Sequence, residues 1–340
     1  MFPRSCTRLL QRFVFAVAYM YCLLLIHHYN DAQNKNQSFL SSNIVKFELE
    51  SRNETLRKQC GLHPGPPTTH QKNQLKNQQN TKLSDFYHKL HLKEASKSLL
   101  YIKDHNLVWC IVPKVASTSW SLALLEQNGF TKEQLRLTEK PLQVILRGVY
   151  RLLSPDKLNA TMASAVSFFF VRHPFERLVS AYRNKLEDSS QEHDGDYFYK
   201  NYGRRIVKKF RKNKKVNSKR EPTFDEFVDY LIGTDINSYD EHWKPIWLYC
   251  NVCEFSYDYI IKYENFKDEN SYFIDKLKAT KHLPQTFELS WENRGNMKSK
   301  SSIDVSKEYF KDLKSEQIWK LYEKYEQDFY YFSYNLEGFV

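Results

Sequence analysis

The chain has 340 residues, 41% of them hydrophobic, which is enough material for one substantial core plus appendages. Its formal net charge is +11. Ten lysines and arginines, with no acid among them, fall in residues 204–220, so the rest of the chain carries only about +1. The basicity is therefore local, and we expect no nucleic-acid partner.

An apolar run at residues 13–26 follows a segment that contains three arginines. The run is shorter than the ~20 residues that cross a typical bilayer, but its flanks can extend it to residues 13–29. Because no small-residue cleavage site follows, a membrane anchor is favoured over a cleaved signal peptide. The first cation after the run is Lys35, so we expect residues 1–12 in the cytosol and the remainder in the lumen.

Residues 30–95 are polar and rich in Asn, Gln, Lys and Ser. They include a Pro-Gly-Pro-Pro break at residues 64–67 and a low-complexity stretch at residues 71–80, neither of which can bury a core. We predict a disordered stem over residues 30–95 and one folded domain over residues 96–340. The sequons for glycosylation of a lumenal chain lie at Asn36, Asn53 and Asn159.

The first motif of the folded domain joins a strand to a helix. Residues 107–112 are an apolar run short enough for a buried strand, and apolar helical spacing resumes at Trp120. Between them lie Pro113, Lys114 and three hydroxyl side chains, those of Ser117, Thr118 and Ser119. A helix N-terminus with a lysine and hydroxyls favours a phosphate or sulfate ligand. The glycine pattern of the common nucleotide loop is missing, and a capped helix with an exposed lysine is the alternative interpretation.

The second motif repeats this arrangement. Residues 167–171 are an aromatic and β-branched run typical of a buried strand, and Pro174 suits the first turn of a following helix. Arg172 then stands at the carboxyl end of a strand, where ligands bind in open α/β sheets and a guanidinium can grip a phosphate with two hydrogen bonds. Ser180 can add a hydroxyl. Residues 122–165, between the motifs, are predicted as helix, loop and helix, which suits a crossover between parallel strands.

Three further elements are predicted downstream. Thr223 and Glu226 form a capping-box pattern at the start of a helix that Gly233 ends. Residues 257–263 are another strand. Residues 318–329 carry an apolar and aromatic stripe at helical spacing, which indicates core packing.

Four cysteines, Cys60, Cys110, Cys250 and Cys253, fall in the part of the chain expected in an oxidising lumen. The last two are spaced like half of a zinc site, but no second pair of ligands follows at a fitting distance. A structural disulfide among the four is therefore favoured over a metal, with the pairing left open.

The two motifs together resemble the 5′-phosphosulfate and 3′-phosphate motifs of Golgi carbohydrate sulfotransferases. The family includes the chondroitin and dermatan 4-O-sulfotransferases and the HNK-1 sulfotransferase. The likeness covers roughly residues 100–335 and continues through Thr223-Phe-Asp-Glu-Phe227, His242-Trp243 and Lys262-Tyr-Glu264. It implies an α/β fold like that of the P-loop NTPases, with a parallel sheet flanked by helices. It also implies 3′-phosphoadenosine 5′-phosphosulfate as the donor, without a metal.

The resemblance assigns donor contacts residue by residue. In the first motif they are Pro113, Lys114, Val115, Ala116, Ser117, Thr118 and Ser119. In the second motif they are Arg172, His173, Pro174, Phe175, Glu176, Arg177, Leu178, Val179 and Ser180.

The implied reaction moves a sulfuryl group to a sugar hydroxyl, in a single-pass type II protein of the Golgi membrane. Lys114 would neutralise the leaving oxygen, and a base must accept the proton of the hydroxyl. The candidate bases are His173, Glu176 and His242. We favour His242, because it lies outside both donor motifs and a neighbouring acid, Asp240 or Glu241, can orient its ring.

The acceptor is expected to be a glycosaminoglycan or another glycan. The 4-O position of N-acetylgalactosamine in chondroitin or dermatan is favoured, because Val115-Ala116 and residues 175–177 look closest to those members; an HNK-1-like glycan terminus is the alternative. The basic run at residues 204–220 is either a solvated segment or a guide for a polyanionic glycan. Two rival functions are a nucleotide kinase-like phosphotransferase and a membrane-anchored glycan-binding protein without catalysis. The oligomeric state is left open.

Overall fold

The structure is a computed structural model that describes residues 41–61, 93, 96–138, 140–150, 152–190, 195–211, 219–289 and 301–340. Contacts divide the chain after Glu48. In the first unit the described residues, 41–48, are helical, and the second unit, Leu49–Val340, carries the sheet. The expected anchor and most of the expected stem lie outside the described residues. Among the described helices, none is long and apolar enough to cross a membrane.

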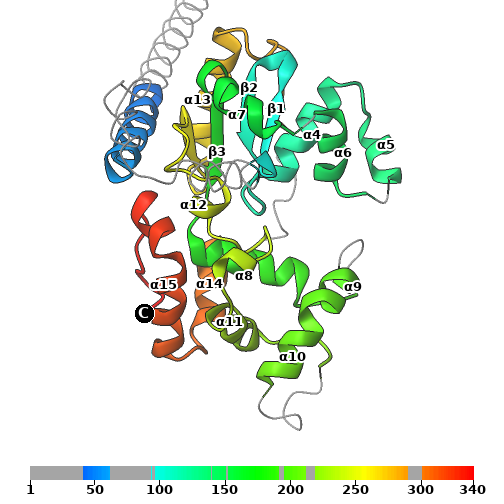
Figure 1. The fold of residues 1–340 in the computed structure, drawn as a ribbon, viewed down its shortest axis with the longest axis vertical. Coiled ribbons are helices and arrows are strands. Elements are labelled where there is room, and N and C mark those ends of the chain that lie inside the picture. Colours follow the sequence, from blue (N-terminus) through cyan, green and yellow to red (C-terminus); the bar gives the residue numbers. More distant parts are fainter. Residues whose placement is uncertain are drawn as a thin grey trace, which may run out of the picture. The chain divides into compact units, whose positions relative to one another are not determined.

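A four-stranded sheet, in the order β1-β2-β3-β4, forms the centre of the second unit (Figure 1). Its strands are β1 (Leu99–Ile102), β2 (Leu107–Cys110), β3 (Val166–Val171) and β4 (Tyr259–Lys262). β2 and β4 both run parallel to β3, as expected, whereas β1 is antiparallel to β2. The prediction of a parallel sheet is wrong for β1, because the short turn at Lys103–His105 returns the chain directly and permits only an antiparallel neighbour.

Among the described residues of the crossover from β2 to β3 there are four helices instead of the two that were predicted. They are α4 (Ser117–Gln127), α5 (Lys132–Leu137), α6 (Leu142–Val149) and α7 (Pro155–Ser164). A capping box between Thr131 and Gln134 starts the extra helix α5. Asn159, which carries one of the sequons, lies exposed on α7.

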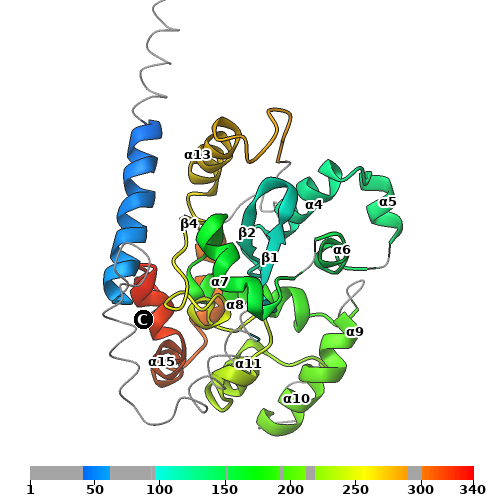
Figure 2. The ribbon, with the colours of Figure 1, turned by 45° about the horizontal axis from the view of Figure 1, so that its top comes forward.

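The remaining helices follow β3 and β4, and those after β3 gather beyond the carboxyl end of that strand (Figures 1 and 2). After β3 come α8 (Pro174–Lys185), α9 (Gly195–Phe198), the π-helix η3 (Tyr199–Gly203), α10 (Arg204–Phe210), α11 (Phe224–Ile232), η4 (Ile236–Ser238) and α12 (Ile246–Tyr249). After β4 come α13 (Phe266–Ala279), α14 (Ser302–Phe310) and α15 (Ser315–Tyr331). The predicted caps are confirmed: Thr223 and Glu226 form the box that starts α11, and Gly233 ends this helix.

Both faces of the central strand β3 are covered by aromatic rings. Phe168 and Phe170 point to one face, where the Trp120 ring of α4 lies 5.1 and 5.8 Å from theirs between centroids. Phe169 points to the other face and packs edge-on against Tyr257 at 4.6 Å. All five side chains are buried, so the alternation of the strand anchors layers on both sides of the sheet. This rigid strand carries Arg172 at its end.

Residues 41–59 form a helix where a disordered stem was expected, so the expectation is wrong for this stretch. Leu49 and Leu56, seven positions apart, are buried on one side of it. Arg52 donates to both carboxylate oxygens of Glu269 in α13, at 2.8 and 2.9 Å. The sequence of this stretch has few apolar residues among many polar ones, so it did not predict a helix. The helix is stabilised by contacts with residues far along the chain.

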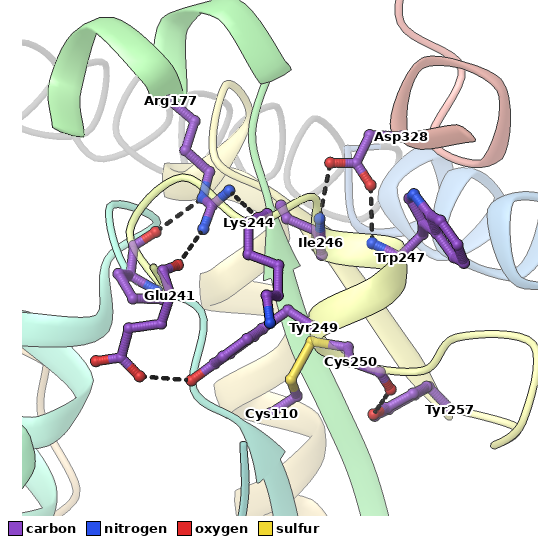
Figure 3. Close-up of a disulfide and its surroundings, with 11 residues drawn as sticks. Cys110, Arg177, Glu241, Lys244, Ile246, Trp247, Tyr249, Cys250, Tyr257 and Asp328 are labelled. Carbon is purple, nitrogen blue, oxygen red and sulfur yellow. Dashed lines mark hydrogen bonds between the residues drawn. A yellow bond between two sulfur atoms is a disulfide. The ribbon is translucent and has the colours of Figure 1, made fainter. Parts of the chain in front are cut away.

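All four cysteines discussed above are paired in two disulfides, which confirms the expectation of structural disulfides. Cys60 is bonded to Cys253, and Cys110 is bonded to Cys250. The second bond joins the end of β2 to the end of α12 (Figure 3). It therefore ties the strand that leads into the first motif to the segment that contains His242.

Candidate active site

The first motif forms a tight turn between β2 and α4. Lys114 and Ala116 both adopt left-handed backbone conformations, with φ of 71° and 64°, and α4 begins at Ser117. Such conformations cost about 1 kcal/mol or more for each non-glycine residue and persist where surrounding contacts impose them. The N-cap, Ala116, has no side-chain oxygen to bind the first amide groups of the helix, and the N-terminus of a helix favours a nearby anion. The predicted arrangement, a strand that leads through a turn into the start of a helix, is present here.

The hydroxyl side chains of this motif differ in exposure. Ser117 and Ser119 are buried in the first turn of α4, whereas Thr118 is only half-buried. Val115 is buried in the core. Thr118 is therefore the hydroxyl of this cluster best placed to meet a ligand through its side chain.

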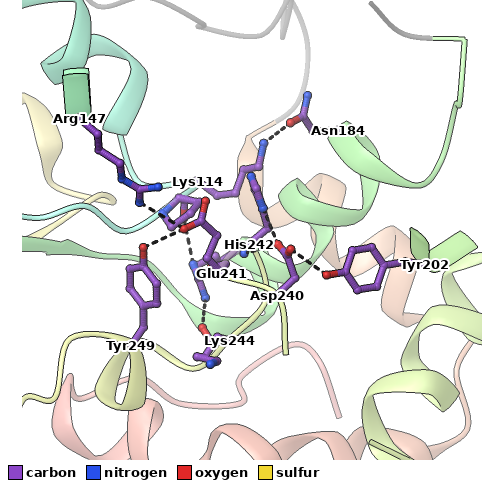
Figure 4. Close-up of polar contacts among 11 residues, drawn as sticks. Lys114, Arg147, Asn184, Tyr202, Asp240, Glu241, His242, Lys244 and Tyr249 are labelled. Atoms are coloured by element: carbon purple, nitrogen blue, oxygen red, sulfur yellow. Dashed lines mark hydrogen bonds and ion pairs between the residues drawn. The ribbon is translucent and has the colours of Figure 1, made fainter. Parts of the chain in front are cut away.

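The Lys114 side chain leaves the turn toward α8, where its ammonium group donates to the side-chain oxygen of Asn184. In Figure 4 it passes beside the His242 ring on this path. Its positive charge contributes to lowering the pKa of His242. The structure thus brings the predicted catalytic cation next to the favoured base, although 128 residues separate them in sequence.

Arg172 links the two motifs from the end of β3. It is buried, with its guanidinium 4.7 Å from the centroid of the Tyr263 ring, and it donates to the carbonyl of Lys114 at 3.2 Å. It also donates to the hydroxyl of Ser302 and lies 3.6 Å from the carboxylate of Glu176. Its Nε atom is buried without a hydrogen-bond partner among the described residues. A buried cation with an unused donor fits a phosphate ligand.

Several side chains of the second motif point into the core instead of the turn. His173 donates from Nε2 to the carbonyl of Asn335 at 2.9 Å and stacks on Phe339. Burial lowers its pKa, so it is neutral near pH 7. Phe175 stacks on Phe310, at 4.5 Å between ring centroids. The other residues of this group are buried as well: Pro174, Glu176, Arg177, Leu178 and Val179.

These contacts separate the predicted donor ligands into two groups. Arg172 and the half-buried Ser180 can offer side-chain atoms to a ligand. His173, Phe175 and Arg177 are committed to packing or to backbone carbonyls of the protein itself. Their assignment as donor contacts rests on the sequence motif, and their side-chain geometry favours structural roles.

His242 lies in the turn between η4 and α12, outside both donor motifs. Its Nδ1 atom is 2.6 Å from Oδ1 of Asp240, and its backbone amide donates to the same oxygen at 3.0 Å. The other oxygen of Asp240 accepts from the hydroxyl of Tyr202, in η3, at 3.1 Å. The Asp240 carboxylate therefore accepts a hydrogen bond from Nδ1–H, which leaves Nε2 as the basic atom (Figure 4).

Burial, assisted by the charge of Lys114, keeps the His242 ring neutral near pH 7. Burial lowers its pKa below the ordinary value of 6.5, the charge of Lys114 lowers it further, and the bond to Asp240 raises it by less. For Asp240, burial raises the pKa, but the hydrogen bond and charge of His242 outweigh burial and lower it. Glu241 turns to other partners, Arg147 at 3.4 Å and the Tyr249 hydroxyl at 3.0 Å. Of the two candidate acids, Asp240 orients the histidine.

Sequence reasoning missed three neighbours of the site. Asn184 binds Lys114. Both Ser302 and Tyr263 contact Arg172. None of the three belongs to either motif. Tyr263 lies in the Lys262-Tyr-Glu264 stretch, which resembles the carbohydrate sulfotransferases but was assigned no role in the site. Ser302 had no signal beyond the Ser-x-x-Asp cap at residues 301–304, which starts α14. Within the described part of the chain, no cluster of His, Cys, Asp or Glu has the arrangement of a metal site.

Comparison with known proteins agrees with this geometry. The model of the sulfotransferase family matches residues 97–335. The chain belongs to the sulfotransferase family. It is 31% identical to mouse carbohydrate sulfotransferase 11 over 255 residues, which cover 72% of this chain and 69% of the relative. It is 28% identical to zebrafish carbohydrate sulfotransferase 14, over 71% of this chain and 61% of the relative. No solved structure matches it significantly.

Membership establishes a sulfotransferase enzyme and makes 3′-phosphoadenosine 5′-phosphosulfate the implied sulfate donor. Human carbohydrate sulfotransferase 9 is 29% identical over 73% of this chain and 55% of its own length. The matched residues contain both motifs, His242 and the second disulfide. The prediction of a carbohydrate sulfotransferase is thereby confirmed at the level of the family.

Proposed function

We propose that this sulfotransferase moves the sulfuryl group of 3′-phosphoadenosine 5′-phosphosulfate to the 4-hydroxyl of N-acetylgalactosamine in chondroitin or dermatan. The observation that carries the reaction class is the meeting of Lys114, Arg172 and the Asp240–His242 pair at the ends of β2 and β3. A cation, a phosphate grip and an oriented neutral histidine are the groups that in-line transfer to a hydroxyl requires.

Each residue of the site has a separate role in donor binding or in transfer. The first turn of α4 and Lys114 hold the phosphosulfate, and Arg172 with Ser180 holds the 3′-phosphate that distinguishes this donor from ATP. His242 takes the proton of the sugar hydroxyl as its oxygen forms a bond to sulfur. The bond from sulfur to the phosphate oxygen breaks, and Lys114 stabilises the negative charge that develops on that oxygen. The nucleotide leaves as adenosine 3′,5′-bisphosphate.

A polyanionic acceptor is supported by the exposed cations of α10. Arg204, Arg205, Lys208 and Lys209 are exposed on this helix, while residues 212–218 of the same basic run lie outside the described residues. α10 continues directly from η3, whose Tyr202 binds Asp240. The basic surface therefore begins one helical segment away from the base, on a path that an anionic glycan chain can follow.

We also propose the Golgi membrane as the location, with residues 13–29 as a type II anchor. The arginine-flanked apolar run supports the topology, and two disulfides suit an oxidising lumen. In intact vesicles, added protease should spare Leu49–Val340 and should digest it once detergent is present. Digestion of this part without detergent would contradict the assignment.

The activity is tested by incubating the purified full-length protein with sulfate-labelled donor and a panel of glycans. Chondroitin and dermatan should accept label, and each transfer should release one adenosine 3′,5′-bisphosphate. Label on an HNK-1 precursor alone would move the acceptor assignment to that class. Binding of the bisphosphate without transfer to any glycan would contradict the proposed acceptors, and binding of ATP but not of the bisphosphate would favour a phosphotransferase.

A further inference from the structure

Arg177 lies in the second motif, yet all three nitrogen atoms of its guanidinium donate hydrogen bonds to backbone carbonyls of the protein. The side chain is 2% exposed, in the middle of α8. Its Nε donates to the carbonyl of Pro113 at 3.0 Å, Nη1 to the carbonyl of Lys244 at 2.7 Å, and Nη2 to the carbonyl of Glu241 at 2.8 Å. Pro113 directly precedes Lys114, and the other two carbonyls flank His242.

These three bonds connect the two catalytic turns to one rigid group. A guanidinium is planar, and its donors point in fixed directions, so three carbonyls that bind it cannot move independently. Burial lowers the pKa of Arg177, while the charge of buried Asp328 opposes this. A desolvated cation is tolerated when its donors are satisfied, and here the acceptors come from the two turns that need alignment.

Asp328 also binds the segment that follows His242. From α15, its two carboxylate oxygens accept the backbone amides of Ile246 and Trp247, each at 2.8 Å (Figure 3). The Cys110–Cys250 disulfide closes the same segment covalently against β2. Figure 3 shows Arg177 and Asp328 reaching neighbouring parts of one short stretch of chain, which both side chains hold.

We propose that Arg177 is a positioning residue that fixes His242 relative to Lys114, and that it is not a ligand of the donor. Asp328 assists Arg177 because it holds the turn that contains His242, although it does not contact the turn that contains Lys114. This inference rests on the proposed function, in which Lys114 and His242 act on the same reacting group. A displacement of about 1 Å between such groups can cost on the order of a hundredfold in rate.

The test is a double-mutant cycle in the full-length protein. Arg177→Lys keeps the charge but replaces three nitrogen atoms in a planar group by a single nitrogen, which cannot reproduce the three separate contacts, so kcat should fall by about 10- to 100-fold. The dissociation constant of adenosine 3′,5′-bisphosphate should change by less than about threefold. In the His242→Ala background, Arg177→Lys should lower kcat by a factor that is at least about fivefold smaller than the factor in wild type. The two losses should not be additive, because Arg177 acts through His242.

A matched control is Arg52→Lys. Arg52 is also an inward-facing arginine that binds a carboxylate and a backbone carbonyl, those of Glu269 and Ile260, but these lie in α13 and β4. Its substitution should lower the thermal midpoint and leave kcat unchanged. If Arg177→Lys does not fold, Asp328→Asn replaces it. This variant should lower kcat by about tenfold, and by less than about twofold in the His242→Ala background.

Equal losses in both backgrounds would overturn the inference, and so would bisphosphate binding weakened tenfold or more with kcat retained. Amide hydrogen exchange of residues 241–247 gives a readout that is independent of turnover: it should accelerate in Arg177→Lys and not in Arg52→Lys. Wild-type protein that transfers no label would refute the proposed function instead, and that result is obtained before any variant is made.

Discussion

The electrostatic environment of His242 predicts two opposite shifts in the pH dependence of turnover. The neutral ring is the base, so kcat should rise as pH increases through its pKa, which burial holds below 6.5. Lys114→Met removes a positive charge that lowers this pKa, so the acid limb should move to higher pH. Asp240→Asn removes a negative charge that raises it, so the limb should move to lower pH.

The size of the effect on rate follows from the bonds lost. Asp240 accepts two hydrogen bonds from His242, at 2.6 and 3.0 Å, and stabilises the imidazolium that forms during transfer. A hydrogen bond to a charged group contributes about 1.5–3 kcal/mol, which corresponds to a loss of roughly 10- to 150-fold in kcat for Asp240→Asn. Lys114→Met should lower the plateau more than it weakens bisphosphate binding, because its charge matters most in the transition state.

The assay is kcat at saturating donor and acceptor, measured from pH 4.5 to 8 for wild type and both variants. Tyr202→Phe is a milder companion: it removes the hydroxyl that shares Asp240 and keeps both charged groups. Its acid limb should stay close to that of wild type. Limbs that shift in the same direction for Lys114→Met and Asp240→Asn, or that do not shift, would refute the assignment of His242 as the titrating base.

Three other substitutions test separate parts of the account. Arg172→Lys should weaken bisphosphate binding about tenfold by calorimetry, because an ammonium cannot grip a phosphate with two parallel bonds; unchanged affinity would remove Arg172 from the donor site. Replacing Arg204, Arg205 and Lys208 together with Gln should raise the acceptor KM and flatten its salt dependence with donor affinity unchanged, whereas an unaltered KM would leave α10 as solvated surface. Phe168→Ala, beneath the Trp120 ring, should cost about 3–5 kcal/mol in urea unfolding, and a loss below about 1 kcal/mol would contradict the packing described for β3.

The local features of the fold could be predicted because their causes are local. Pro174 begins α8 because proline lacks only the backbone N–H that the start of a helix leaves unpaired anyway. Thr223 caps the start of α11 through a hydrogen bond to a residue three positions away. The helix at residues 41–59 and the antiparallel β1 could not be predicted in the same way. Each depends on pairing with distant segments, as the Arg52–Glu269 contact illustrates.

The candidate site was predictable in composition but not in orientation. The motifs indicated Lys114 and Arg172, and in the structure the guanidinium of Arg172 donates to the backbone carbonyl of Lys114. A motif, however, does not state which of its side chains face the ligand. His173 and Arg177 turn inward because their partners, Asn335 and the carbonyls beside His242, come from segments far along the chain.

The most direct test of the central claim is turnover by His242→Ala in a variant that stays folded and binds adenosine 3′,5′-bisphosphate with wild-type affinity. In this variant, kcat for transfer to chondroitin or dermatan should fall by about a hundredfold or more. Neither His173 nor Glu176 should compensate, because one is bonded to Asn335 and the other lies buried beside Arg172. Near-normal turnover in this variant would contradict the claim that His242 takes the proton of the acceptor.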